Sequence, residues 1–356
     1  MPNERVNIPH VLDDPPPFHQ KLLDYGERPY WSADGSRIAF IEQNYGDACE
    51  IDLATDKVRN LTKDLGDHHS FLRVLILSNG DYLLIGPAKF KDRDVSRRVE
   101  SELWVLDKNL NRPPKPLGRR IAEGAGVSAR EPRITYAVTG RNDPSIGGPD
   151  VHECHVTDIA YGDEGPGLGQ DRVFYRTRAG AAPEPQDFRH DDTEVIFAEY
   201  SHRRVAGVTP DARCVVKGYW LDNGEFTTYI TESMVHNEPE GIFPDQEHIC
   251  LESSCDNDSD YPPQNLWKLK LDGSQERVRM TSMPADRTWK ATNSNVSPDG
   301  RWLAFMVALQ SDESGYGRGL GLLDLHAWGQ SPESQQWETP TSRAQAQHDP
   351  MPRSLS

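Results

Sequence analysis

The sequence predicts an all-β protein, a six-bladed β-propeller with four antiparallel strands in each blade. The first observation is a repeated hairpin, in which an apolar run, a turn of the Pro-Asp-Gly kind and a second apolar run follow one another. Its clearest copies are residues 30–40, 241–251 and 295–305. These turn residues suit a tight connection between antiparallel strands. A repeat of about 50 residues is typical of propellers and solenoids.

The second observation is an Asp that follows the last apolar or Thr residue of a later strand in each repeat. Six copies occur, and they end at Asp52, Asp107, Asp158, Asp222, Asp272 and Asp324. Another β-rich run follows most copies, which gives the four strands that a blade requires. The even spacing favours the propeller over the two alternatives, an open stack of hairpins and a two-sheet sandwich.

The hairpin turns place the blades along the chain in order. They lie at residues 32–35, 77–80, 127–130, 189–192, 243–245 and 297–300. The third turn is degenerate, and we assign it because the step between its neighbours is twice the usual one. Residues 25–339 are therefore expected to form the propeller. Residues 1–24 would be an N-terminal extension that closes the last blade, and residues 340–356 a disordered tail.

Two segments are candidates for the strand that completes the last blade. Residues 335–339 could form it, or residues 5–11 could pair with the last blade from the N-terminus. The second arrangement would join the two ends of the chain and remove an exposed sheet edge.

Composition excludes several classes of partner and site. The net charge of −17 disfavours nucleic acid and anionic membranes. Five cysteines without a C-x-x-C pair argue against a disulfide framework and a structural zinc site. The polar N-terminus and the absence of a long apolar run predict a cytoplasmic protein without a membrane span.

The hairpins at residues 30–40 and 295–305 resemble the W-S-P-D-G-x-x-I-A-F core of the TolB-like, or WD40-like (PD40), β-propeller repeat family. The resemblance implies a six-bladed ring. Its superfamily includes periplasmic scaffolds, propeller domains of serine peptidases and oligogalacturonate lyases. The lyases bind a divalent metal through His and Gln at the channel mouth. This chain lacks their Gln-x-x-His-x-His cluster, and it lacks the G-x-S-x-G elbow of the peptidases.

The residues that precede each hairpin should lie together at one mouth of the channel, because the first strand of each blade lines it. His236, Glu238 and His69 are the candidate catalytic residues and the candidate ligands of a divalent metal. The candidate ligand-binding residues are Arg28, Arg73, Glu184, Gln186, Glu240, Trp289, Lys290 and Asn293. Alternatively, these side chains line a wet channel and pair across blades to hold the ring closed.

The sequence is compatible with two functions. The first is an acid–base enzyme of the lyase, isomerase or cyclase type, which acts on a small polar molecule such as a sugar or a secondary metabolite. The second is a non-catalytic propeller scaffold that binds a protein partner. The polar run at residues 236–240 favours the enzyme.

Overall fold

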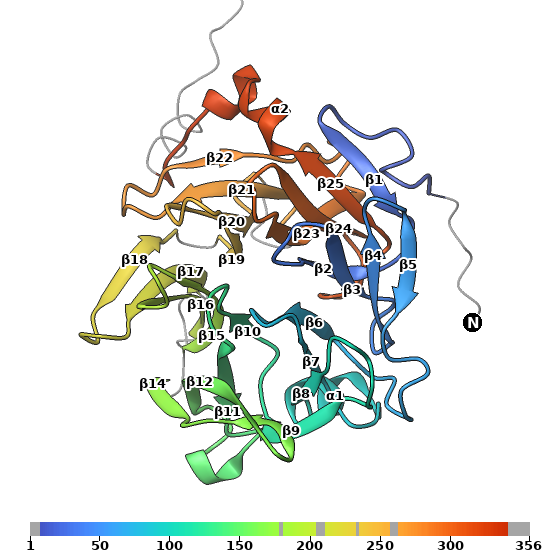
Figure 1. Cartoon of the computed structure of the whole chain (residues 1–356). Coiled ribbons are helices and arrows are strands. Elements are labelled where there is room, and N and C mark those ends of the chain that lie inside the picture. The colour runs from blue at the N-terminus through green and yellow to red at the C-terminus, as the bar shows by residue number, and fades with distance from the viewer. Residues whose placement is uncertain (1–7, 178–180, 204–210, 233–234, 257–262, 341–356) are drawn as a thin grey trace, which may run out of the picture.

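The computed structural model describes residues 8–177, 181–203, 211–232, 235–256 and 263–340, and it confirms the six-bladed propeller. Six sheets surround a central axis (Figure 1). The predicted tail, apart from its first residue, and residues 5–7 lie outside the described residues.

Each blade has its innermost strand first, and the later strands follow outward. Blade 1 contains β2 (Glu27–Trp31), β3 (Arg37–Ile41), β4 (Ala48–Asp52) and β5 (Lys57–Asn60). Blade 2 contains β6 (Arg73–Ile76), β7 (Tyr82–Gly86), β8 (Glu102–Leu106) and β9 (Lys115–Arg120). Blade 3 contains β10 (Ala125–Val127), β11 (Arg133–Thr139), β12 (His152–Gly162), β13 (Gly165–Leu168) and β14 (Arg172–Thr177).

The second half of the ring follows the same order. Blade 4 contains β15 (Ala182–Arg189), β16 (Glu194–Arg203), β17 (Asp211–Trp220) and β18 (Phe226–Ile230). Blade 5 contains β19 (Asn237–Ile242), β20 (His248–Ser253), β21 (Asn265–Lys270) and β22 (Arg277–Arg279). Blade 6 contains β23 (Trp289–Val296), β24 (Trp302–Leu309), β25 (Leu320–Asp324) and β1 (His19–Leu23).

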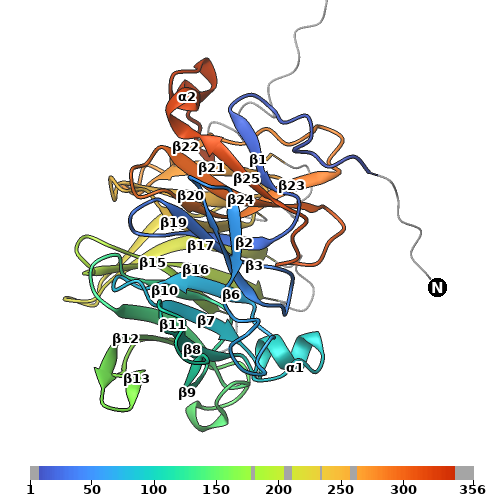
Figure 2. The same ribbon diagram turned by 45° about the vertical axis from the view of Figure 1, so that its right-hand side comes forward.

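The strand that closes the ring lies within the predicted N-terminal extension, residues 1–24, but it is neither of the two shorter segments that we considered from sequence. β1 pairs with β25, with His19 opposite Leu323, and the two strands lie side by side in Figures 1 and 2. Residues 8–11 precede this strand and do not join the sheet. Residues 336–339 follow the short helices α2 (Leu325–Gly329) and η2 (Pro332–Gln335), and they form no named strand: Glu338 makes an isolated β-bridge with Arg277.

The repeated turns have the same hydrogen bonds in blades 1 and 6. Ser32 Oγ donates to Asp34 Oδ1 at 2.6 Å, and Ser297 Oγ donates to Asp299 Oδ1 at 2.6 Å. The glycine that follows each Asp has a positive φ of about 70°, which L side chains rarely adopt. In the Ser-x-Asp-Gly motif, the Ser and Asp side chains therefore hydrogen-bond within the turn, and the glycine supplies its positive φ.

Apolar side chains gather in six clusters, and each cluster lies between two adjacent blades. Phe40 of blade 1, for example, packs with Met306 of blade 6 in one cluster. A fully buried side chain of this size stabilises the fold by about 1.5–3 kcal/mol. Apolar packing between adjacent blades therefore stabilises the ring, and polar side chains line the central channel.

Two helical insertions interrupt the strands near the site. α1 (Arg93–Arg98) lies between β7 and β8, and Asp92 caps it by accepting a 2.9 Å hydrogen bond from the Val95 amide. The one-turn η1 (Pro144–Ile146) lies between β11 and β12. No helix within the described ranges has the length and apolar character that a membrane span requires.

Candidate functional site

Four of the six innermost strands carry a β-bulge at the same level of the channel. The register shifts fall between Glu27 and Tyr30, Pro185 and Asp187, Pro239 and Ile242, and Thr292 and Asn295. A bulge turns a side chain out of the regular alternation, and bulges are common beside functional sites. The bulge residues Arg28, Gln186, Glu240 and Asn293 line a common cavity in the channel, and Arg73 of the unbulged β6 joins them.

Two bulge residues have a left-handed backbone without being glycine. Arg28 has φ 52° and Asn293 has φ 43°. Such conformations cost on the order of 1 kcal/mol for an ordinary side chain. The fold accepts this cost at two of the residues that the sequence marked as ligand-binding candidates.

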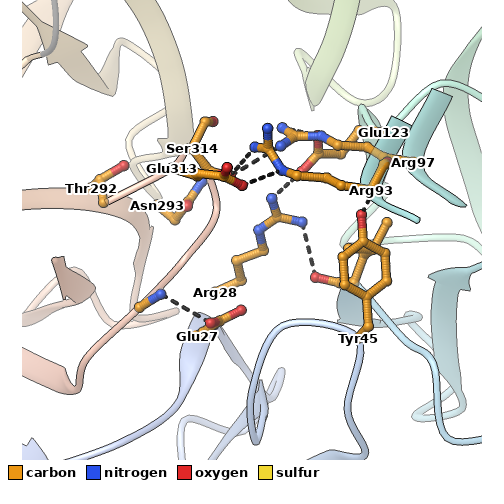
Figure 3. Close-up of polar contacts among 12 residues, drawn as sticks. Glu27, Arg28, Tyr45, Arg93, Arg97, Glu123, Thr292, Asn293, Glu313 and Ser314 are labelled. Carbon is orange, nitrogen blue, oxygen red and sulfur yellow. Dashed lines mark hydrogen bonds and ion pairs between the residues drawn. The ribbon is translucent and has the colours of Figure 1, made fainter. Parts of the chain in front are cut away.

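One side of the mouth is closed by arginines that meet Glu123, which precedes β10. Arg28 and Arg97 both form ion pairs with Glu123. Arg97 Nη1 also donates to the Ser314 carbonyl at 3.0 Å, and Arg93 Nε lies 2.9 Å from Glu313 Oε2. Figure 3 shows these groups meeting above Arg28. α1 of blade 2 is thereby joined to the β24–β25 loop of blade 6.

The two arginines decide the charge of Glu123. Burial by itself would raise the pKa of this carboxyl group, but the charges of Arg28 and Arg97 lower the pKa to about 2. Glu123 is therefore ionised and paired with both arginines. Its role is structural, because these ion pairs join the elements that surround the mouth.

The other side of the mouth holds a cluster of His236, Glu238 and Glu252. One donor atom from each lies within 4.8 Å of the other two. His236 Nε2 is 3.0 Å from Glu238 Oε2, and Glu252 Oε1 accepts hydrogen bonds from Thr292 Oγ1 and the Asn293 amide, each at 2.5 Å. One imidazole nitrogen and two carboxylates are ligands that suit Mn²⁺ or Zn²⁺. The donor set therefore fits a divalent cation.

Among the glutamates around His236, one carboxyl group has a pKa below its ordinary value and three have a pKa above it. For Glu238, burial would raise the pKa, but the hydrogen bond and charge of His236 lower it. For Glu184, burial and then the charges of Glu238 and Glu123 raise the pKa to about 8. Burial also raises the pKa of Glu252, and that of Glu240 well above its usual value.

Glu184 has no hydrogen-bond or ion-pair partner among the described residues. Gly124 lies directly against its side chain, because a Cβ on Gly124 would fall 2.1 Å from Glu184 Cγ. A larger residue at position 124 would displace this carboxyl group. The glycine thus leaves room for a protonated acid beside the channel.

Of the residues predicted from sequence, the structure brings most together. Arg28, Arg73, Glu184, Gln186, His236, Glu238, Glu240 and Asn293 line the mouth or the cavity below it, and they are joined by contacts or mutual charge effects. Lys290 lies beside them, with Nζ 3.2 Å from the Asp312 carbonyl.

Two predicted residues lie elsewhere. His69 forms a 2.7 Å contact with Asp47, and its side chain is 42% exposed, so it does not join the His236 cluster. The prediction placed it with His236 by counting back from the turn, but in the structure its imidazole pairs with Asp47 of the β3–β4 connection. Trp289 is buried in the apolar cluster between blades 5 and 6, where its ring lies 5.2 Å from that of His10.

Three residues of the mouth were missed from sequence: Arg97, Glu123 and Glu252. Glu252 could have been found, because it lies directly opposite Glu238 in the hairpin whose turn the sequence marks. Arg97 belongs to an insertion between strands, and Glu123 belongs to a connection without a motif. Nothing in the local sequence of these two residues indicates where their side chains go.

Comparison with solved structures agrees with the fold. Oligogalacturonate lyase in complex with manganese has a TM-score of 0.51 and 11% identity over 85% of this chain and 79% of its own. The tricorn protease has a TM-score of 0.52 and 14% identity over 89% of this chain, which spans only 26% of the protease chain. TolB from Acinetobacter baumannii has a TM-score of 0.49 and 12% identity over 90% of this chain and 65% of its own.

The likeness is one of fold. Oligogalacturonate lyase is a six-bladed propeller, in agreement with the six blades observed here. No family model and no curated protein sequence matches the chain.

Proposed function

We propose that the protein is an acid–base enzyme of the lyase, isomerase or cyclase type, which binds a small polar organic molecule at the Glu184–His236 mouth of the channel. The observation that carries the proposal is the pair of carboxyl groups with opposite environments. The hydrogen bond and charge of His236 lower the pKa of Glu238, whereas Glu184 has no partner among the described residues and a pKa of about 8. Two neighbouring carboxyl groups whose environments move their pKa values apart meet the requirement for an acid and a base at neutral pH.

The residues divide into roles on this proposal. Glu238, with His236 behind it, takes a proton from the ligand, and Glu184 gives a proton to the group that leaves or rearranges. Elimination, isomerisation and cyclisation need no more than such proton transfers. Gln186, whose Nε2 lies 3.4 Å from Glu238 Oε1, orients the base.

His236, Glu238 and Glu252 would hold a divalent cation at the same place. When bound, the cation would polarise an oxygen of the ligand as a Lewis acid. The manganese complex of oligogalacturonate lyase, a fold neighbour at 11% identity, supports a search for a metal and does not identify one. Without a cation, His236 and Glu238 remain an imidazole–carboxylate pair.

Metal content measured by mass spectrometry tests the cation site. The protein is dialysed against Mn²⁺ or Zn²⁺ and then against buffer. We expect about one equivalent in the wild type, a loss of at least tenfold in His236→Ala, and full retention in His69→Ala. The second variant is a matched control because His69 is exposed and pairs with Asp47. Equal metal content in both variants, or none in the wild type, would remove the cation from the proposal.

A ligand screen tests the enzyme itself. Carboxylated and neutral sugars are incubated with the protein. Elimination from a carboxylated sugar is followed by the ultraviolet absorbance of the conjugated double bond, and isomerisation or cyclisation is followed by nuclear magnetic resonance. Turnover that falls at least a hundredfold in Glu238→Gln and in Glu184→Gln, with melting temperatures near that of the wild type, would support the assignment. Turnover that survives both changes would contradict it. If no small molecule binds, the protein-binding scaffold becomes the better hypothesis.

A further inference from the structure

Arg73 is a buried cation without a hydrogen-bond or ion-pair partner in the part of the chain that the structure describes. Its side chain starts β6, and the residue is 7% exposed. None of the described residues forms a hydrogen bond with its guanidinium group, and none has a carboxylate oxygen within 4.0 Å of it. Burying a charge without a partner is costly. The other arginines of the mouth, Arg28 and Arg97, both have ion pairs.

The cavity that Arg73 lines is small and polar. Its volume is about 40 Å³, and it lies in the waist of the channel with Arg28, Gln186, Glu240 and Asn293 on its wall. One water requires about 10–15 Å³ of such volume. The cavity therefore has room for a group of about three heavy atoms, such as a carboxylate.

Two side-chain amides on the cavity wall each have an N–H group that is not used in a hydrogen bond between the described residues. Gln186 Nε2 donates to Glu238 at 3.4 Å, and Asn293 Nδ2 donates to Glu240 at 3.2 Å. Each amide nitrogen carries two hydrogens, so one remains on each. Together with the guanidinium fork, they offer the donors that a carboxylate binds.

The charges around Arg73 must also be considered. Burial lowers the pKa of Arg73, but the charges of four glutamates, with Glu240 first and then Glu123, Glu184 and Glu238, raise it above its ordinary value. Glu123 is occupied by two other arginines and Glu238 by His236. Asp187 lines the cavity as well, and its carboxylate accepts a hydrogen bond from the Gly241 amide at 3.2 Å. Glu123 and Glu238 therefore have cationic partners of their own, and burial raises the pKa of Glu184 and Glu240, which favours their uncharged form. The guanidinium is thus left for a ligand.

We propose that Arg73 binds a carboxylate group of the ligand in the waist of the channel. The inference deepens the proposed function, because it names the group by which the ligand of the same mouth is held. A carboxylate at Arg73 would place the rest of the molecule against Gln186, which in turn contacts Glu238.

Thermal unfolding with formate as the probe tests this site without any turnover. Formate, chloride and inorganic phosphate are compared at equal ionic strength near pH 7. At ten times its Kd, formate is expected to raise the melting temperature by about 2 °C. Chloride and phosphate should not exceed the effect of ionic strength. Arg73→Gln should lose the formate shift, and Arg130→Gln should keep it, since Arg130 is exposed at the opposite mouth beside Asp191.

Arg73→Lys covers the case in which Arg73→Gln fails to fold. It keeps the charge and loses the fork, so we expect the Kd for formate to rise at least tenfold with an unchanged circular dichroism spectrum. A formate shift that is equal in the wild type and in the Arg73 variants would overturn the proposal. A chloride shift as large as that of formate would also overturn it, because the site would then bind a halide only. Neither result bears on the metal content of His236→Ala, so the two proposals fail separately.

Discussion

Glu184 and Glu238 show how neighbours decide the chemistry of a residue. Both precede a proline at the same level of an innermost strand, in blades 4 and 5. Two residues before Glu238 is His236, which bonds to it, whereas two residues before Glu184 is Ala182. The same side chain is therefore a candidate base in one blade and a candidate acid in the next.

The raised pKa of Glu184 predicts a pH dependence of stability. The ordinary value is 4.5 and the folded value is about 8, so the folded state binds more protons than the unfolded state between these values. The free energy of unfolding then falls as the pH rises from about 4.5 to 8, by up to about 1.4 kcal/mol per pH unit. We expect Glu184→Gln to remove this slope, so that its stability relative to the wild type increases between pH 5 and pH 8.

Denaturant unfolding at pH 5, 6.5 and 8 measures this difference. Glu131→Gln is the matched control, because Glu131 is exposed on the blade 3 hairpin turn. A difference between Glu184→Gln and the wild type that stays constant with pH would show that Glu184 titrates normally.

At the scale of elements, the closing strand and the bulges distinguish this ring from six plain sheets. β1 covers the edge of β25, and an uncovered edge would offer its free backbone groups to other chains. The segment before it is anchored by Leu12, which is 2% exposed in the cluster between blades 5 and 6. Closure therefore combines strand pairing with core packing.

Leu12→Ala tests how far this anchor holds the ring. Truncation of a buried leucine leaves a cavity and costs about 3 kcal/mol. We expect that loss in denaturant unfolding, together with faster aggregation on heating as β1 detaches. Gln20→Ala, in β1 but exposed to solvent, should change the stability by less than about 0.5 kcal/mol. Similar losses in both variants would mean that Leu12 does not anchor the strand.

At the scale of the whole molecule, the packed ring buries the cysteine thiols. All five cysteines are free and buried. Burial raises the pKa of Cys49 to about 12 and raises those of Cys154, Cys214 and Cys250 as well. A thiol that is both inaccessible and protonated is a poor nucleophile.

A thiol reagent should therefore report on the integrity of the ring. We expect dithionitrobenzoate to modify none of the five cysteines in the native protein within minutes, and all five in 6 M guanidinium chloride. The absorbance of the released thiolate measures the number modified. Rapid modification of the native protein would show that a blade interface opens in solution.

The sequence by itself determined the ring, the number of blades and most residues of the mouth. It could do so because turn chemistry and strand alternation are local, and they repeat six times with nearly constant spacing. The Ser-x-Asp-Gly turns at Asp34 and Asp299 are formed by residues within five positions of one another.

Tertiary structure alone decided which groups meet. The pairing of β1 with β25 joins segments about 300 residues apart, and no local pattern distinguishes His19–Leu23 from the neighbouring residues. Arg97 reaches Glu123 from an insertion, and His69 pairs with Asp47 of the neighbouring β3–β4 connection instead of joining His236. Contacts of this kind depend on the path of the chain around the ring, and that path is fixed only when all six interfaces are packed.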